Sequence, residues 1–309
     1  MSNWRHAFLA IIALVPLSAA ADVKVDDLPE NTVWYLHVDF EKLRGTESGK
    51  VLSRWIQWEV YDEINEELGV DLNKEVNQFT AFSDTSNGAV MLIDGPVSAA
   101  TIDTVMTMIR EEEPVEVRRH GKQEYFHVGD EERTGRSGND PFDDLEDSAY
   151  FSFAIDGRIL ITGSEANMQS LLDNGGRVPG ARSHDGALLV LSANQSIVQA
   201  GIHPEGLVDD DDDDDWESNI VRNTKQAALL VADESGQLAI EAQLESTDPT
   251  IAQSIAGIVN GLIGLQAFNS ELGPEIQSLI RNTKVEVFEN VLSINTVVDP
   301  ELVLNILEH

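Results

Sequence analysis

The side chains best suited to bind a metal ion form one run of aspartates, followed by Trp216 and Glu217. The run comprises Asp209, Asp210, Asp211, Asp212, Asp213, Asp214 and Asp215. Adjacent carboxylates repel one another, so we expect them to be exposed and solvated by water and cations. Calcium favours carboxylate ligands, but the segment lacks the glycine turn and the alternating ligands of an EF-hand loop. The run therefore predicts diffuse cation binding, with a specific calcium site as the alternative, and no other cofactor is expected.

A second motif has the position of a phosphate-binding loop. The segment 45–51, GTESGKV, follows a predicted strand and precedes a predicted helix. Its two glycines are one residue too close for that motif, and Val51 replaces the Ser or Thr that would hold magnesium. We therefore expect no nucleotide here, and we expect Thr46 or Ser48 to cap the helix.

Nucleophilic and metal-dependent catalysis find little support in the sequence. No G-x-S-x-G nucleophile elbow and no H-E-x-x-H pair occurs. His37 and Asp39 are two residues apart on a predicted strand, so they share a face, and we expect them to form a solvent-side pair at a sheet edge. The 55 acidic residues leave open a carboxylate pair suited to hydrolysis, but such a pair is defined by its separation in space. The sequence assigns no catalytic residue.

The net charge of −35, from 55 acidic and 20 basic residues, limits the partners of this chain. Phosphate backbones and anionic lipid headgroups would repel it, so neither nucleic acid nor an anionic membrane surface is an expected partner. The acidic residues are spread along the whole chain. Because molar salt shortens the Debye length to about 3 Å and screens their repulsion, we interpret the acidity as an adaptation to a saline medium outside the cell.

The amino terminus predicts export. Residues 1–21 combine Arg5, an apolar stretch over 7–17 and a small-residue end, which is the pattern of a cleavable signal peptide. The apolar stretch is shorter than the roughly 20 residues that a membrane span needs. The chain has no cysteine, which excludes disulfides and a lipid-accepting cysteine. We therefore expect a soluble periplasmic or secreted protein with no membrane span after cleavage.

The remaining pattern predicts an α+β fold built from a duplicated module of mostly antiparallel sheet, with helices packed on one face. Turn residues such as Asn87-Gly88 and Asp156-Gly157 predict hairpins, and the Asp, Ser, Gly turn that begins at Asp84 recurs at Asp233. In the first half, 22–176, strands are expected at 32–39, 78–83, 89–93, 124–128, 150–155 and 158–162, and helices at 48–68, 98–110 and 165–172. In the second half, 186–309, strands are expected at 187–191, 226–232, 237–244, 284–288 and 291–296, and helices at 250–268 and 300–307.

Three segments interrupt this pattern. Residues 129–148 are rich in Gly, Asp and Glu and predict an acidic flexible loop, and residues 177–185 predict a linker between the halves. The aspartate run 209–215 is interpreted as an insertion in the second half.

The helix expected at 250–268 contains no charged residue, and Gly257 and Gly261 have a G-x-x-x-G spacing. This spacing is typical of closely packed helices. Gln253 and Asn260 would be costly in lipid, so we expect the helix to pack tightly on a sheet, or to form an interface between the halves or between the subunits of a homo-oligomer.

Together these features predict an exported, non-catalytic interaction or ligand-binding module of the envelope or the medium, with another envelope protein or a small ligand as partner. An exported hydrolase that uses carboxylates, with or without a divalent metal, is the alternative, and a calcium-binding exported protein is the third hypothesis. Converging carboxylates with a perturbed pKa would favour the hydrolase, whereas an exposed apolar patch would favour the interaction module.

Overall fold

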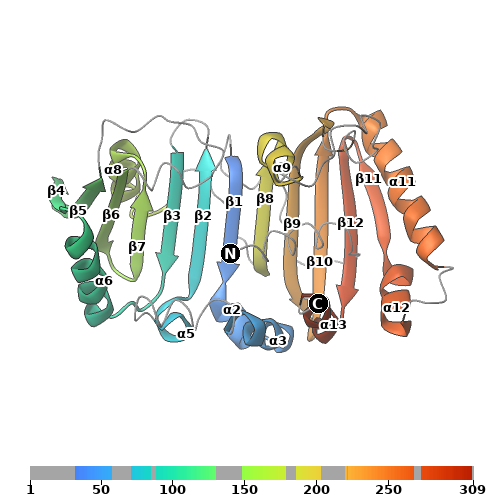
Figure 1. The fold of residues 1–309 in the computed structure, drawn as a ribbon, viewed down its shortest axis with the longest axis horizontal. Helices are drawn as coiled ribbons and strands as arrows, with labels where there is room; N and C mark the ends of the chain where they lie inside the picture. The colour runs from blue at the N-terminus through green and yellow to red at the C-terminus, as the bar shows by residue number, and fades with distance from the viewer. Residues whose placement is uncertain are drawn as a thin grey trace. The chain divides into compact units, whose positions relative to one another are not determined.

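The computed structural model describes residues 32–57, 71–84, 88–129, 148–178, 186–202, 220, 222–267 and 273–307 (Figure 1). It confirms the predicted α+β class, because helices pack on antiparallel sheet. The described residues divide into two compact units, one with residues 32–45 and 53–178 and the other with residues 46–52 and 186–307. We call them the first unit and the second unit.

The sheet of the first unit has the strand order β1-β2-β3-β7-β6-β5-β4, and every neighbouring pair is antiparallel. Its strands are β1 (Thr32–Asp39), β2 (Gln78–Asp84), β3 (Gly88–Asp94), β4 (Glu116–His120), β5 (Gln123–Gly129), β6 (Ser148–Ile155) and β7 (Arg158–Thr162). Its helices are α2 (Phe40–Gly45), α5 (Leu72–Glu75), α6 (Ala99–Glu112) and α8 (Glu165–Asp173), and α8 packs on β6 and β7. The helix α3 (Glu47–Ile56) contributes its first turns to the second unit.

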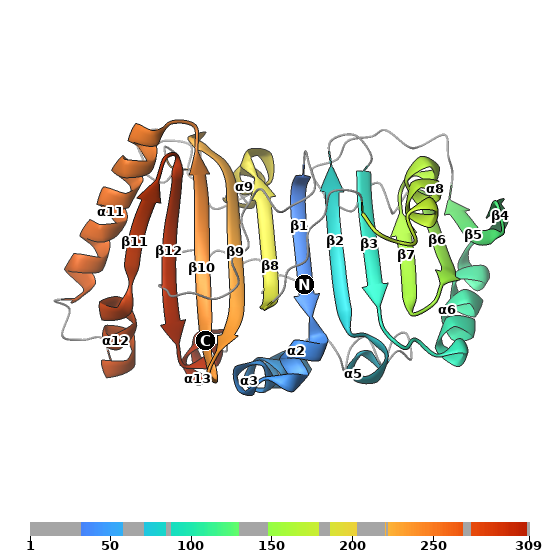
Figure 2. The ribbon, with the colours of Figure 1, turned by 180° about the vertical axis from the view of Figure 1, so that it is seen from behind.

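The sheet of the second unit has the order β8-β9-β10-β12-β11, again antiparallel throughout. Its strands are β8 (Ala187–Asn194), β9 (Thr224–Glu234), β10 (Gln237–Ser246), β11 (Lys284–Phe288) and β12 (Val291–Val298). Its helices are α9 (Gln195–Ile202), α11 (Pro249–Ala267), α12 (Pro274–Asn282) and α13 (Pro300–Leu307). The helix α11 packs on β10, β11 and β12 and lies beside β11 in both views (Figures 1 and 2).

The two units share one topology, as the predicted duplication requires. Five strands of each sheet correspond in their order across the sheet, which is β1-β2-β3-β7-β6 in the first unit and β8-β9-β10-β12-β11 in the second. The same pairs of strands also correspond in chain order. The helices α6 and α11 each follow the first hairpin, and α8 and α13 each follow the second. The β4–β5 hairpin is an addition to the first unit, and α12 is an addition to the second. The positions of α6 and α11 are therefore equivalent.

The predicted hairpins form because their turn residues accept left-handed backbone angles. Gly157 closes the β6–β7 turn with φ 70°, and Ser235 and Gly236 close the β9–β10 turn with φ 55° and 86°. Glu289 closes the β11–β12 turn with φ 54°. The pairing of Asp84 with Gly88 confirms the remaining predicted hairpin between β2 and β3.

A close backbone contact fixes the turn after β3. A Cβ atom at Gly95 would overlap the carbonyl oxygen of Glu75 and would lie 2.9 Å from the backbone nitrogen of Asn77. Only glycine fits at this position without a backbone shift.

Several elements differ from the sequence-based expectations. The sequence patterns did not indicate α2, α5, β4, α9 and α12. The helix expected at 48–68 is described up to Ile56, and its predicted end lies outside the described residues. Ser148, assigned to the acidic loop, begins β6, and Gly129 ends β5. The rest of that loop, the signal segment 1–21 and most of the linker lie outside the described part of the chain.

Candidate functional site

The predicted metal-binding run 209–215 lies outside the described residues. Among the side chains that the structure describes, no group of three or more His, Asp or Glu is arranged to hold a metal ion. Calcium binding by the aspartate run therefore stays a prediction.

The expected solvent-side pair of His37 and Asp39 is buried, so that prediction is wrong. Both residues share a face of β1 with the buried Tyr35, whose pKa is raised by its burial. His37 Nδ1 lies 2.8 Å from Oγ1 of Thr80. Asp39 directly precedes α2 and accepts a hydrogen bond from the backbone nitrogen of Lys42 at 2.8 Å, and the Lys42 ammonium lies 3.0 Å from its other oxygen. Asp39 is therefore a helix cap.

The segment 45–51 binds a carboxylate, and this carboxylate is a side chain of the protein itself. Thr46 Oγ1 accepts a hydrogen bond from the nitrogen of Gly49 at 3.2 Å, which confirms the predicted cap. The backbone nitrogen of Ser48 donates to Oδ1 of Asp233 at 3.3 Å, and the Ser48 hydroxyl donates to the same oxygen. A helix N-terminus attracts anions. Here the carboxylate of Asp233, which lies near the end of β9 in the same unit, occupies that position.

A set of chemically capable side chains gathers on β4, β5, β6 and α8. Oε1 of Glu165 accepts hydrogen bonds from the hydroxyl of Tyr125 at 2.5 Å and from Arg118 at 3.1 Å. Burial, and then the bond to Glu165, raise the pKa of Tyr125. Arg118 also donates to Oε2 of Glu116 at 2.8 Å, which lowers the pKa of Glu116. We call this set the Arg118 cluster, and it consists of Glu116, Arg118, Tyr125, His127, Ser148, Tyr150 and Glu165.

His127 brings the Arg118 cluster close to a catalytic arrangement. Its ring is buried and stacks on the ring of Tyr150, with centroids 4.6 Å apart. Its Nε2 lies 3.1 Å from Oγ of Ser148. A serine nucleophile needs a histidine at this distance. No sequence pattern indicated this contact, because the residues lie on different strands and Ser148 was assigned to a loop.

The other ring nitrogen of His127 faces both a donor and an acceptor. Nδ1 lies 3.5 Å from a guanidinium nitrogen of Arg118, which can only donate, and 3.6 Å from Oε2 of Glu116, which can only accept. The exposure of Ser148 decides the chemistry. A serine nucleophile must reach its substrate, and Ser148 is only 1% exposed. We therefore interpret the Arg118 cluster as structural, because its hydrogen bonds link β4 and β5 to α8 and β5 to β6.

Exposed apolar side chains gather on one stripe of α11. Ile258, Leu262 and Leu265 are 38%, 42% and 71% exposed, and their spacing places them on one side of the helix. The side that packs on the sheet adjoins this stripe and includes the buried Ala252, Ile255 and Ala256. An exposed apolar patch of this kind marks an interaction surface.

The glycines of α11 open onto the same stripe. A Cβ atom at Gly257 or Gly261 would meet nothing within 4 Å. The helix packs on the sheet as expected, but alanine and isoleucine make that contact and the glycines do not. We call Gly257, Ile258, Gly261, Leu262 and Leu265 the α11 face.

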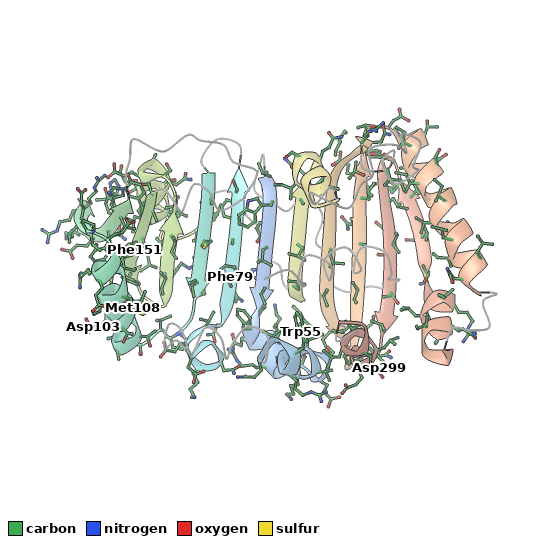
Figure 3. The ribbon with its side chains drawn as sticks, viewed as in Figure 1. Trp55, Phe79, Asp103, Met108, Phe151 and Asp299 are labelled. Atoms are coloured by element: carbon green, nitrogen blue, oxygen red, sulfur yellow. The ribbon has the colours of Figure 1, made fainter. Side chains whose placement is uncertain are left out.

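The equivalent helix of the first unit has the opposite surface. Exposed residues of α6 include Asp103, Thr104 and Arg110, and Figure 3 labels Asp103 on this helix. The 19 residues of α11 include no charged side chain. A surface helix normally turns charged and polar residues to water. The two helices hold equivalent positions, but α6 has the charged exposed residues of a solvent-facing helix, whereas α11 has none. The composition of α11 is typical of a helix that another molecule covers.

Comparisons with known proteins give structural likeness alone. No family model matches the sequence, and no curated protein matches it. Crystal form III of TP0453 is 11% identical with a TM-score of 0.45, covering 94% of this chain and 99% of that chain. Crystal form IV is 11% identical with a TM-score of 0.46, covering 93% and 97%. Function must therefore be inferred from this chain's own residues.

Within the described ranges, no helix combines the length and the hydropathy that crossing a membrane requires.

Proposed function

We propose that this chain is an exported, non-catalytic interaction protein of the cell envelope or the medium, and that the α11 face is its binding surface. The observation that carries the proposal is the uncharged, apolar and exposed stripe of Ile258, Leu262 and Leu265 in a chain with a net charge of −35. Water would favour charged side chains at these positions, as it does on α6. A partner that covers the stripe accounts for their absence.

The Arg118 cluster supports the non-catalytic part of the proposal. Its serine, Ser148, is only 1% exposed, so its hydroxyl is closed to a substrate. Glu116 and Glu165 both accept from the same guanidinium, whose single positive charge is shared between the two carboxylates. These carboxylates are thus held as ion-pair partners, whereas hydrolysis needs one carboxyl group that can give up a proton.

Export and acidity complete the proposal. The pattern at residues 1–21 supports secretion, and the excess of acid supports solubility in a saline medium. Thermal unfolding of residues 22–309 should then occur at higher temperature as NaCl rises from about 0.1 to about 2 M, because added salt screens the repulsion between carboxylates. Calcium chloride at matched ionic strength should add nothing further. A melting temperature that is flat in NaCl but rises with micromolar calcium would favour a specific calcium site instead.

Affinity purification tests the binding surface. The tagged chain is recovered from its own envelope fraction or culture medium, alongside Leu262→Glu on α11 and Thr104→Glu on α6. Both variants add one carboxylate to an exposed helix position, so their net charges match. A bound protein that is lost with Leu262→Glu and kept with Thr104→Glu supports the proposal. Recovery of the tagged chain with neither another protein nor an untagged copy of itself, or equal recovery of partners by both variants, contradicts it.

A further inference from the structure

We infer that a second copy of this chain covers the α11 face, forming a weak twofold dimer that salt strengthens. The inference rests on the proposed function, since it names the occupant of the same surface. Two properties of α11 support a second copy, namely its lack of charge and the shape of its stripe. Its small area limits the affinity.

Charge separates a second copy from other partners. A protein attracted by the acidity of this chain would have a basic surface and would find carboxylates elsewhere to pair with, whereas the α11 face offers it none. Two copies with a net charge of −35 each repel one another. Contact between two uncharged helices places no carboxylate of either helix against the other. The α11 face is therefore suited to a partner of the same sign of charge.

The stripe is complementary to itself. Gly257 and Gly261 leave a shallow groove, since a Cβ at either would meet nothing within 4 Å. Ile258 and Leu262 form a ridge directly beside that groove, one residue along. A twofold axis near these residues places the ridge of each copy in the groove of the other, as an isologous interface requires. Close approach of two helices through glycine is a known use of this spacing.

The area of the stripe limits the affinity. A helix of 19 residues is about 28 Å long. One helix pair buries less than the roughly 1,600 Å² of a standard interface. The dimer is therefore weak, with a dissociation constant on the order of 100 μM at physiological salt. Screening of the repulsion at about 2 M NaCl should tighten it about tenfold.

Sedimentation equilibrium of residues 22–309, from about 5 μM to about 1 mM, measures the association at low and high salt. Gly261→Ala is the decisive variant, because alanine favours an exposed helix and should not lower the melting temperature, while its methyl group fills the groove. We expect it to weaken the dimer at least tenfold. Leu262→Glu should abolish the dimer, and Thr104→Glu should leave it within about twofold of the parent.

Cysteine cross-linking locates the interface, since the parent chain has no cysteine. Ile258→Cys should form a covalent dimer on oxidation at high salt, and Thr104→Cys on α6 should not. A chain that is monomeric at about 1 mM in about 2 M NaCl overturns the inference, as does a dimer that salt weakens or that Leu262→Glu leaves intact.

The outcomes also separate this inference from the proposed function. A monomeric chain whose envelope partner is lost with Leu262→Glu keeps the proposed function and overturns the dimer. A monomeric chain that binds vesicles of zwitterionic lipid through Leu262 overturns the dimer in favour of a lipid surface. A dimer that retains a separate envelope partner in Leu262→Glu supports the inference and contradicts the assigned binding surface.

Discussion

Replacement of Asp233 by alanine should destabilise the second unit, although it removes a negative charge from a very acidic chain. The Asp233 carboxylate accepts both the backbone N–H and the hydroxyl of Ser48. Ser48 is completely buried, so loss of its acceptor costs about 1–3 kcal/mol. Removal of the anion from the start of α3 costs a further 0.3–1 kcal/mol, approximately. The free energy of unfolding should therefore fall by about 1.3–4 kcal/mol.

A control of equal charge separates this contact from general repulsion. In a chain with a net charge of −35, unspecific electrostatics predicts that loss of any carboxylate stabilises the fold. Asp103 is exposed on α6, and alanine favours a helix. Asp103→Ala should therefore be neutral or stabilising, opposite in sign to Asp233→Ala.

A double-mutant cycle with Ser48→Ala isolates the pair. The double variant removes donor and acceptor together, so we expect a coupling energy of about 1–2 kcal/mol. Because two units need not unfold as one, amide hydrogen exchange on β9 and β10 should accompany urea denaturation. Coupling below about 0.3 kcal/mol, or an Asp233→Ala variant as stable as the parent, would refute the assignment of this carboxylate as the anion of α3.

Three further predictions follow from single contacts. Gly95→Ala should lower the free energy of unfolding, measured by urea titration, by about 3 kcal/mol or more, because the added Cβ would overlap the backbone. Gly45→Ala is the control, because its Cβ would meet nothing within 4 Å, and it should change the free energy of unfolding by less than about 1 kcal/mol. Asp248 accepts from the backbone at the start of α11, which lowers its pKa. The ionised Asp248 therefore stabilises the fold above its unfolded pKa of about 3.9, and this contribution is lost as the pH falls through the lower folded pKa. The Asp248→Asn variant should have a lower urea midpoint than the parent at pH 7 and an equal midpoint at about pH 2. Tyr125→Phe removes the hydrogen bond to Glu165 and should cost about 1 kcal/mol by thermal unfolding, and an unchanged midpoint would count against that bond.

Local sequence signals were sufficient for most of the fold. A hairpin is specified by the few residues of its turn, so the pairs around Gly157 and Gly236 could be predicted without knowledge of the rest of the chain. The duplication was visible for the same reason, since the turn at Asp84 recurs at Asp233. Edge strands lack this advantage. The strand β4 reads EVRRH, and charged residues that protect an edge also remove the alternation that predicts a strand.

The contacts of the candidate site depend on tertiary structure. Sequence showed that α11 is uncharged, but apolar residues occur on both of its sides, so helical periodicity could not tell which side meets the sheet. The burial of Ala252 and the exposure of Leu265 are decided by the shape of the sheet beneath. The partnership of His127 with Arg118 could not be predicted either, because it requires the register of β4 on β5.

Acidity and the α11 face form one argument about specificity. Contact through α6 would bring exposed residues such as Asp103 toward the carboxylates of a second copy, whereas contact through α11 adds no charge from the helix. Like-charge repulsion thus disfavours most relative orientations of two copies and penalises the α11 contact least, which is how negative selection against wrong contacts produces specificity. Salt removes this discrimination as it strengthens association. Cross-linking at Ile258 should therefore be most selective over other exposed sites at intermediate salt, where wrong orientations are still repelled. Selectivity that increases continuously up to molar salt would show that shape, and not charge, selects the orientation.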